Sequence, residues 1–362
     1  MSVVIFLVVL SVLIIVHEAG HFATAKALGV KVERFAIGLG PKLFSRFYKG
    51  TEFAVCLFPL GGYVKMAGDE RADCKGTPHE YYSHSPGHRA LIVLMGPVVN
   101  YLMAFVCFFI VFLIGYPTLA PKVGEVVSGY PAQIAGLQTN DTITQINSLK
   151  IDSWEQIQKS VSTAKTNELN LTVLRDNQSL QVRVVPKIES IVNIFGQSEN
   201  VRIIGIKPKE EIILLKYDFG KSLQNSFERL VEITVMTYKA LYRMATGAMS
   251  PKDSMTGPIG IFYIIQKAAS MGISYLLYIV AIISASLAIF NLLPLPVLDG
   301  GHLFFLGIEK FRRRPLSPKT DEIISRVGLS LIICLAIFIF YTDIERYGLI
   351  GKLVNFWQKL GL

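Results

Sequence analysis

The chain has 362 residues, of which 51% are hydrophobic and only 17% charged, and its mean hydropathy is +0.45. These values lie outside the range of soluble globular domains and indicate an integral membrane protein, with the lipid bilayer as a partner. The formal net charge of +9 does not indicate nucleic-acid binding, because the basic residues flank apolar segments and have no base-stacking aromatics between them.

Four apolar segments are long enough to cross a bilayer, at about 2–22, 91–114, 275–298 and 327–342. A cleaved signal peptide is the alternative for the first segment, but no basic residues precede it and no small-residue cleavage site follows it. The sequence therefore predicts an α-helical polytopic membrane protein with four transmembrane helices.

The string His17-Glu18-Ala19-Gly20-His21 lies toward the end of the first segment. On a helix, the i, i+4 spacing puts both histidines on one face, where they can hold zinc while the glutamate acts as general base. A chance match or a helix cap is the alternative. With only six histidines in the chain, a chance match is rare, so we expect a metalloprotease motif.

The basic residues predict the orientation of the spans. The stretch 23–90 carries ten Lys and Arg residues and the stretch 303–326 carries six. Positive residues favour the cytoplasmic side. Both stretches are therefore expected in the cytoplasm, which leaves both termini and residues 115–274 outside.

This orientation predicts a third metal ligand. The first and third spans both run inward, so His17 and His21 should lie at the depth of Asp299, near the end of the third span. An aspartate at membrane depth is costly unless it is paired or functional. Two histidines and one aspartate leave the fourth position of a catalytic zinc for water. Zinc acidifies that water, and Glu18 would take its proton.

His302 is a competing ligand, because it follows Asp299 by three residues and would share its face if a helix resumed there. We expect Gly300 and Gly301 to turn the backbone away before His302, which leaves His302 to support the ligands or to pack at the membrane interface. The other three histidines, His79, His84 and His88, lie in a polar stretch and are expected to be solvated.

Four motifs resemble the site-2 protease family of intramembrane zinc metalloproteases, in particular its bacterial RseP, or regulator-of-sigma-E, type. They are HEAGH at 17–21, GPVVN at 96–100, GPIGI at 257–261 and NLLPLPVLDGGH at 291–302. The resemblance implies His17, His21 and Asp299 as Zn²⁺ ligands, Glu18 as catalytic base and Asn291 as a substrate contact. It also implies a bacterial inner-membrane location. The substrates would be single-span membrane proteins that are already shortened, such as anti-sigma factors and remnant signal peptides.

A hairpin is expected in the first cytoplasmic stretch. Phe53, Val55 and Leu57 alternate with other residues, and Pro-Leu-Gly-Gly then ends a short strand at Gly61 and Gly62. The resemblance implies that this hairpin is membrane-associated and lies beside the zinc. There these five residues would bind substrate, because pairing against a strand edge holds a segment extended. An ordinary packed hairpin is the alternative.

Residues 123–147 resemble the start of a PDZ domain of bacterial proteases, within about 121–187. Pro131 should start a short helix and Gly136 end it, and Ile143 should open a core strand. A helix near 153–164 and strands near 168–174 and 180–185 should follow. The fold class is thus a membrane protein with an inserted extracytoplasmic α+β PDZ domain.

The PDZ region occurs once, whereas many RseP-type members carry two copies in tandem. Its groove would bind a peptide or a C-terminal tail as an added strand. The alternative, which is compatible with it, is a steric plug that restricts access to the active site. Residues 219–247 have apolar positions at helical spacing, as in an amphipathic helix that lies on a membrane and either gates entry or anchors the chain.

The expected organisation is a protease domain in two halves, 1–116 and 273–362, around a PDZ domain at 117–190 and a following region at 191–272. The leading hypothesis is an intramembrane zinc endopeptidase. A catalytically silent PDZ membrane scaffold is the first alternative, although every catalytic position is filled. A metal transporter is the second, but the spans show no repeat.

Overall fold

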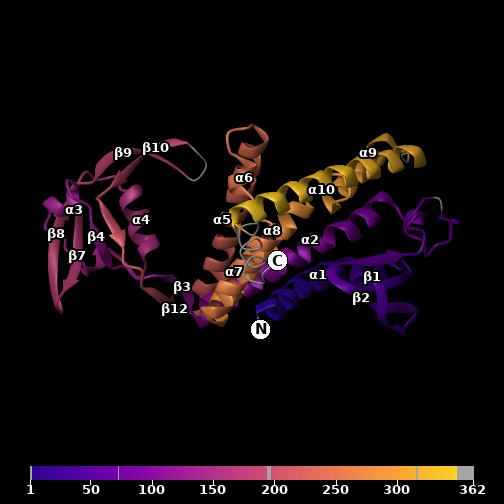
Figure 1. Ribbon diagram of the computed structural model, residues 1–362, viewed down its shortest axis with the longest axis horizontal. Helices are drawn as coiled ribbons and strands as arrows, with labels where there is room; N and C mark the ends of the chain where they lie inside the picture. Colours follow the sequence, from indigo (N-terminus) through magenta and orange to yellow (C-terminus); the bar gives the residue numbers. More distant parts are fainter. Residues whose placement is uncertain (1, 72, 194–196, 315–316, 349–362) are drawn as a thin grey trace, which may run out of the picture. The chain divides into compact units, whose positions relative to one another are not determined.

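The computed structural model describes residues 2–71, 73–193, 197–314 and 317–348 (Figure 1). Residue 1 and residues 349–362, for which we predict an extracytoplasmic location, lie outside the described residues. The chain divides into two compact units. The first comprises Met1–Phe109, Ser226–Lys239 and Pro251–Leu362, and the second comprises Ile110–Asn225 and Ala240–Ser250.

Within the described part of the chain, four helices are long and apolar enough to cross a membrane, which confirms the four predicted spans. They are α1 (Ser2–Ala27), α2 (Pro86–Ile114), α8 (Ile273–Asn291) and α10 (Pro318–Arg346). The third helix ends at Asn291 and not at residue 298 as predicted. Pro294 and Pro296 explain the difference, because proline lacks an N–H donor and disfavours helical backbone in the residue before it.

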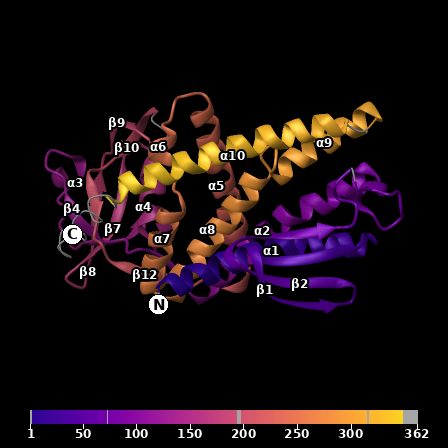
Figure 2. The same cartoon turned by 45° about the vertical axis from the view of Figure 1, so that its right-hand side comes forward.

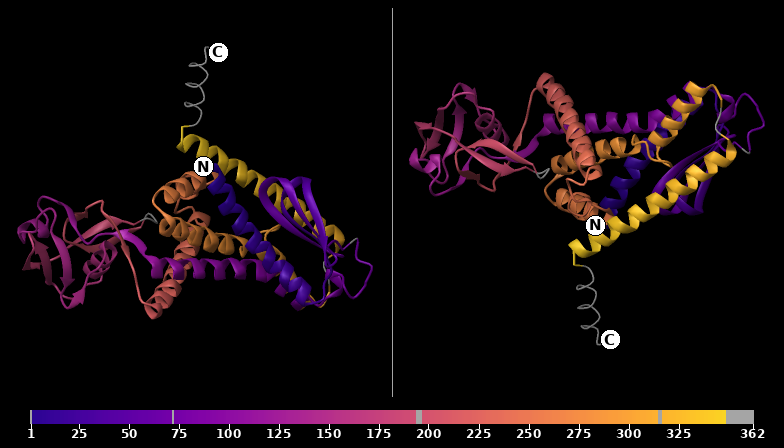
Figure 3. Two further views of the ribbon diagram at one scale, coloured as in Figure 1. Left: turned by 90° about the horizontal axis from the view of Figure 1, so that it is seen from below. Right: turned by 90° about the horizontal axis from the view of Figure 1, so that it is seen from above.

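Two long strands, β1 (Val32–Tyr48) and β2 (Thr51–Met66), lie against α1 (Figure 3). Residues 34–37 of β1 pair with 62–65 and also with 52–55, while residues 42–48 pair with 51–56. The prediction of a short hairpin that ends at Pro-Leu-Gly-Gly is therefore wrong in its extent. The backbone bends at Gly38, whose φ of +87° suits glycine, and β2 continues through both glycines.

A buried carboxylate joins the stretches of this sheet. Glu52 is 6% exposed and accepts hydrogen bonds from Arg34 Nε at 2.6 Å and Lys42 Nζ at 2.7 Å. Arg34 also donates to the hydroxyl of Tyr63 at 3.2 Å. The hydrogen bonds from Lys42 and then from Arg34 lower the pKa of Glu52 to about 2. These contacts connect residues from all four paired stretches.

The second unit contains a four-stranded sheet in the order β6-β5-β7-β8, and Figure 2 labels its strands β7 and β8. Its elements are α3 (Pro131–Ile134), β5 (Thr142–Ile146), β6 (Leu149–Lys150), α4 (Trp154–Ser162), β7 (Leu169–Arg175) and β8 (Gln178–Val184). The helices and strands predicted for this region are thus confirmed. Ile143 and Leu171 of the sheet are fully buried against Ile157 of α4, so the core is apolar.

The remaining strands of the second unit bring its two ends together. They are β3 (Tyr116–Leu119), β4 (Val123–Val126), β9 (Lys187–Val192), β10 (Ser198–Ile203), β11 (Ile206–Pro208) and β12 (Ile212–Leu215). β9 and β10 form a hairpin, β11 pairs with β4, and β12 pairs with β3. The fold of the second unit therefore includes the strands up to residue 215.

The predicted amphipathic helix is α5 (Phe219–Ala245). Apolar side chains repeat along one face of it and are exposed: Phe219, Leu223, Phe227, Val231, Val235, Tyr238 and Tyr242. The hydroxyl groups of Thr234 and of Tyr101 in α2 lie 3.2 Å apart. One face of α5 thus carries a continuous apolar stripe.

Two shorter helices follow, α6 (Pro251–Ser254) and α7 (Pro258–Ser270). The N-terminus of α7 is capped by Asp343 of α10, which is fully buried. Its carboxylate accepts hydrogen bonds from the N–H groups of Gly257 at 3.1 Å and Gly260 at 3.0 Å. A carboxylate at this end of a helix satisfies unpaired donors and complements the helix dipole.

Helix α9 (Asp299–Arg312) begins at the predicted third ligand. The prediction that Gly300 and Gly301 turn the backbone away before His302 is wrong, because both lie in the first turn of this helix. A Cβ atom at Gly300 would lie 2.3 Å from the Leu292 carbonyl oxygen. The glycines permit this close approach, and His302 follows Asp299 on the same helix face.

Candidate active site

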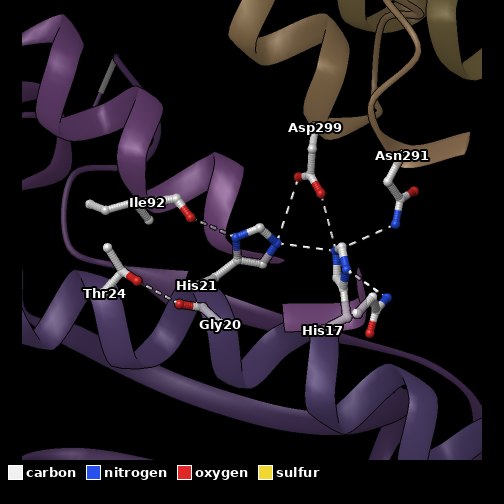
Figure 4. A network of polar contacts seen from close by, with 8 residues as sticks. His17, Gly20, His21, Thr24, Ile92, Asn291 and Asp299 are labelled. Atoms are coloured by element: carbon white, nitrogen blue, oxygen red, sulfur yellow. Dashed lines mark hydrogen bonds and ion pairs between the residues drawn. The ribbon is translucent and has the colours of Figure 1, made fainter. Parts of the chain in front are cut away.

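His17 and His21 lie one turn apart on α1, and their Nε2 atoms are 3.2 Å apart (Figure 4). Asp299 faces them from the start of α9, with Oδ2 3.1 Å from His17 Nε2 and Oδ1 3.6 Å from His21 Nε2. Among the described residues, these three form the one cluster with metal-ligand geometry, and their ligand atoms lie within 4.8 Å of one another. The structure therefore brings together the three predicted ligands.

The backbone of α2 orients the second histidine. His21 Nδ1–H donates a hydrogen bond to the Ile92 carbonyl oxygen at 2.9 Å (Figure 4). This bond places the imidazole proton on Nδ1 and leaves the lone pair of Nε2 directed at the cluster. His21 is thus prepared to act as a neutral ligand.

Asn100 of α2 lies beside the other histidine, with its amide nitrogen 3.2 Å from His17 Nδ1. Its Oδ1 atom is buried and has no hydrogen-bond partner. A half-turn of the amide exchanges the two atoms, so that Oδ1 accepts from Nδ1–H of His17. Both imidazoles then carry their protons on Nδ1 and direct Nε2 at Asp299.

Glycines allow α1 and α2 to approach closely at this point. A Cβ atom at Gly96 would lie 2.4 Å from the ring of His21 and 2.9 Å from that of His17. A Cβ atom at Gly20 would lie 2.3 Å from the Met95 carbonyl oxygen. Any larger residue at either position would displace the histidines or separate the helices.

The donor set fits a cation. Two Nε2 lone pairs and a carboxylate converge, and Asp299 Oδ2 is buried without a hydrogen-bond donor. The side chains of His17, His21 and Asp299 are only 13%, 12% and 17% exposed, so water does little to stabilise the charge. The Asn291 amide lies near only one of these acceptors, at 3.5 Å from His17 Nε2, so the three acceptors repel one another unless a metal ion lies between them.

A cavity of about 310 Å³ adjoins the cluster. Its walls include Glu18, His21, Asp299 and His302, and it extends to Arg89 and Glu309. Glu18 therefore faces a space that can hold water next to the ligands. His302 lines the same space and is not one of the three clustered residues.

The predicted substrate contacts lie in different places. Asn291 Nδ2 is 3.5 Å from His17 Nε2, at the edge of the cluster. Gly62 approaches Glu18, whose Cγ atom would be 3.1 Å from a Cβ there, and Gly61 precedes it in the strand. Phe53 packs instead against Phe22 of α1, with ring centroids 5.7 Å apart.

Val55 and Leu57 are 42% and 47% exposed. They extend the apolar surface of the sheet and do not join the cluster.

A model of peptidase family M50 matches residues 5–335 of the chain. The chain belongs to peptidase family M50. It is similar to a Campylobacter jejuni protein whose name assigns it to the zinc metalloproteases, with 36% identity over 93% of this chain and 92% of the relative. It is also similar to the zinc metalloprotease RasP of Oceanobacillus iheyensis, with 29% identity over 95% of this chain and 99% of the relative.

A third relative is the regulator of sigma E protease of Haemophilus influenzae, with 28% identity over 94% of this chain and 98% of the relative. This M50 chain is thus a zinc metalloendopeptidase, and zinc is the cation that its donor set fits. Part of the chain is similar to the PDZ domain of an SdrC-like protein from Listeria innocua. That similarity covers 25% of this chain and 96% of the Listeria domain, with 19% identity and a TM-score of 0.21.

Sequence reasoning missed Ile92, Gly96 and Asn100 as partners of the two histidines. The sequence does indicate two of these partners, because the GPVVN motif places Gly96 and Asn100 four residues apart on one face of an apolar helix. A small residue and an amide on one face of a membrane helix indicate a close helix contact with a polar partner.

Proposed function

We propose that the protein is an intramembrane endopeptidase in which His17, His21 and Asp299 hold the zinc ion and Glu18 is the general base. The observation that carries this proposal is that three possible ligand atoms, two from α1 and one from α9, converge within 4.8 Å of one another. Two imidazoles and one carboxylate are a donor set of the kind that holds catalytic zinc.

The reaction is hydrolysis of a peptide bond. His17, His21 and Asp299 would hold the zinc ion, which would supply Lewis acidity toward the water and the scissile carbonyl. Glu18 takes one proton from the attacking water and later transfers it to the leaving nitrogen, so that a C–O bond forms as the C–N bond breaks. Ile92 and Asn100 hold the imidazoles in the required tautomer. The cavity beside Glu18 supplies the water.

The substrate strand is proposed to lie along residues 62–65 of β2. This stretch pairs with residues 34–37 on one side, and Gly62 lies next to Glu18. A helical substrate hides its amide groups, so addition to a strand edge would extend it and present a bond to the zinc. Asn291 would hold the substrate near the ligands. Phe53, Val55 and Leu57 would maintain the apolar surface beneath it.

The substrates are proposed to be single-span membrane proteins that are already trimmed, such as anti-sigma factors or remnant signal peptides. The relatives named RasP and regulator of sigma E protease support this class. The chain would reside in the bacterial inner membrane, with the PDZ domain and both termini extracytoplasmic. The division into domains at 1–116, 117–190, 191–272 and 273–362 is part of this proposal.

The PDZ region is proposed to bind a peptide or a C-terminal tail and to limit access to the site. Residues 115–274 contain neither histidine nor cysteine, so its deletion should leave zinc bound while changing which substrates are cut. Loss of zinc from a folded deletion variant would contradict this role.

The test is zinc-dependent cleavage of a single-span model protein by the full chain in proteoliposomes. Glu18→Gln should keep zinc and lose cleavage, whereas Asp299→Asn should weaken zinc binding and lose cleavage. His302→Ala should retain zinc. If Asp299→Asn keeps both zinc and activity while His302→Ala loses them, the ligand assignment is wrong. If the unmodified chain with zinc cuts nothing, the catalytically silent scaffold is favoured.

The orientation is tested separately by cysteine labelling in a cysteine-free background. A cysteine at position 176 should react with an impermeant reagent from outside, and one at position 313 only from the cytoplasmic side. The reverse pattern would exclude the proposed topology.

A further inference from the structure

The helix that supplies the third ligand is fixed at its far end by a buried charge. Asp299 begins α9, and His302, Leu306 and Glu309 follow it at helical spacing along the wall of the same cavity. Glu309 is 9% exposed. A carboxylate so enclosed is costly unless it is paired.

Two arginines pair with Glu309. Arg89 of α2, itself 3% exposed, donates from Nη2 to Oε1 at 2.5 Å and from Nη1 to Oε2 at 3.4 Å. Arg71 donates to Oε2 at 2.8 Å. The ring of Tyr82 faces both guanidinium groups, at 4.4 Å from Arg71 and 5.1 Å from Arg89. The cluster combines bidentate hydrogen bonds with cation–π contacts.

Glu309 is ionised in this cluster. Burial alone would raise its pKa, but the hydrogen bonds from Arg89 and then Arg71 outweigh burial and hold the pKa of Glu309 below its ordinary value. The bond between α9 and α2 is therefore a salt bridge at neutral pH.

The same helix α2 orients both histidines. Arg89 lies one turn before Ile92, the partner of His21, on the helix that also carries Gly96 and Asn100. The Arg89–Glu309 bond thus joins the helix that sets the two imidazoles to the helix that sets Asp299. The helix moves as a rigid body over the roughly 15 Å between residues 299 and 309. A rotation of α9 about its axis, or a shift along that axis, at Glu309 therefore moves Asp299 as well.

We propose that Glu309 is a positioning residue, which through Arg89 fixes the rotation and axial position of α9 and so places Asp299 against His17 and His21. This inference rests on the proposed function, because it takes Asp299 as a zinc ligand. A displacement of about 1 Å at a reacting group can lower the rate about 100-fold, so a remote clamp of this kind is consequential.

The test compares two double variants of the full chain. Arg89→Met/Glu309→Met removes the clamp and leaves only the Arg71 guanidinium of this cluster, which is 19% exposed and still faces the Tyr82 ring, so the variant should be able to fold. Glu322→Met/Arg326→Met is the matched control, since it removes an exposed ion pair of α10 whose side chains are 60% and 78% exposed. Zinc Kd is measured by competition with a chelator, and kcat and KM with the single-span substrate.

The clamp variant should bind zinc about 10-fold more weakly. Its kcat should fall at saturating zinc while KM stays unchanged. A residue that only stabilised the fold would shift the unfolding temperature and leave these values unchanged. The control variant should match the unmodified chain in all three values.

Unchanged zinc Kd and kcat in the clamp variant would overturn the proposal. If that variant does not fold, Glu309→Asp provides the test. It keeps the negative charge, but its side chain is one methylene shorter, so the carboxylate no longer reaches Arg89 in the same way. Normal zinc Kd and kcat in Glu309→Asp would again overturn the proposal. Failure of the proposed function looks different, because Asp299→Asn would then retain zinc and activity whatever Glu309 does.

Discussion

The sheet of the second unit and helix α1 of the first place their side chains in opposite ways. In the sheet, Ile143 and Leu171 are fully buried, and the apolar core holds the unit together. Along α1, Val4 and Val8 are 63% and 55% exposed, while the polar His17 is enclosed. Burial of apolar area drives assembly in water, but lipid is as apolar as the side chains themselves.

The long helices of the first unit are therefore joined in part by close packing of small residues and by polar bonds. Gly20 and Gly96 let α1 and α2 touch, and the hydroxyl of Ser284 in α8 donates to the Asn100 carbonyl oxygen at 2.8 Å. The comparison predicts that, where α1 and α2 touch, adding one methyl group is the most damaging substitution. In the core of the second unit's sheet, removing methyl groups is the more damaging one.

Gly96→Ala is expected to have the largest effect. Its Cβ atom would overlap the His21 ring, at 2.4 Å, so zinc binding and cleavage should both be lost. Gly87→Ala is the matched control in the same helix, because only Ser85 Oγ lies near, at 3.9 Å. Zinc content and cleavage rate are the measurements. Normal zinc content in Gly96→Ala would contradict the close contact of α1 and α2.

Ile143→Ala should destabilise the second unit by about 2–5 kcal/mol, because it leaves a cavity in a closed apolar core. Ile134→Ala is the control, since that side chain is 83% exposed, and it should be nearly neutral. Denaturant unfolding followed by hydrogen exchange in residues 142–175 reports the difference. If the two variants were equally stable, burial of Ile143 in this core would not stabilise the second unit.

Asn100→Ala should weaken zinc binding about 10-fold, as removal of a partner that orients a ligand does in other metal sites. The reason is that His17 Nδ1–H loses its acceptor. Tyr101→Phe, the control, removes only the hydroxyl contact with Thr234. Competition with a chelator measures the zinc Kd of both variants. If Asn100→Ala leaves the zinc Kd unchanged, Asn100 does not orient His17, and Asp299 alone would do so.

The smallest effect concerns acid stability of the β1–β2 sheet. The pKa of Glu52 falls from its ordinary value of 4.5 to about 2, so its ion pairs stabilise the fold above pH 4.5. This contribution declines as the pH falls from 4.5 toward 2, because protonation removes the charge. Glu52→Gln should reduce this pH dependence, whereas Glu33→Gln, an exposed change on β1, should not. Acid unfolding of the two variants provides the measurement.

Periodicity and hydropathy predicted the elements that depend on local sequence. Three of the four predicted spans and the helices and strands between 131 and 184 fall where they were expected. The third span was predicted too long because residues 292–298 are almost all apolar, and hydropathy does not register the effect of Pro294 and Pro296 on backbone geometry. The hairpin was predicted too short because its second pairing depends on bends at Gly38 and Gly40.

The proposed ligands could be predicted because a histidine or an aspartate in or next to an apolar segment is costly unless it is paired or functional. Their partners could not, because Ile92 contributes a backbone oxygen that any residue could supply. The role of Gly300 was misjudged for a related reason. Glycine indicates either a turn or a close approach, and only the packing of Leu292 against α9 decides between them.

The cap that Asp343 forms on α7 has a consequence for biosynthesis. The N–H groups of Gly257 and Gly260 precede their acceptor by 86 and 83 residues. A nascent chain that has just completed α7 therefore still lacks the carboxylate that caps this helix. Chains that terminate before residue 343 should leave the first unit unfinished, and quality-control proteases should remove them before they can cut other membrane proteins.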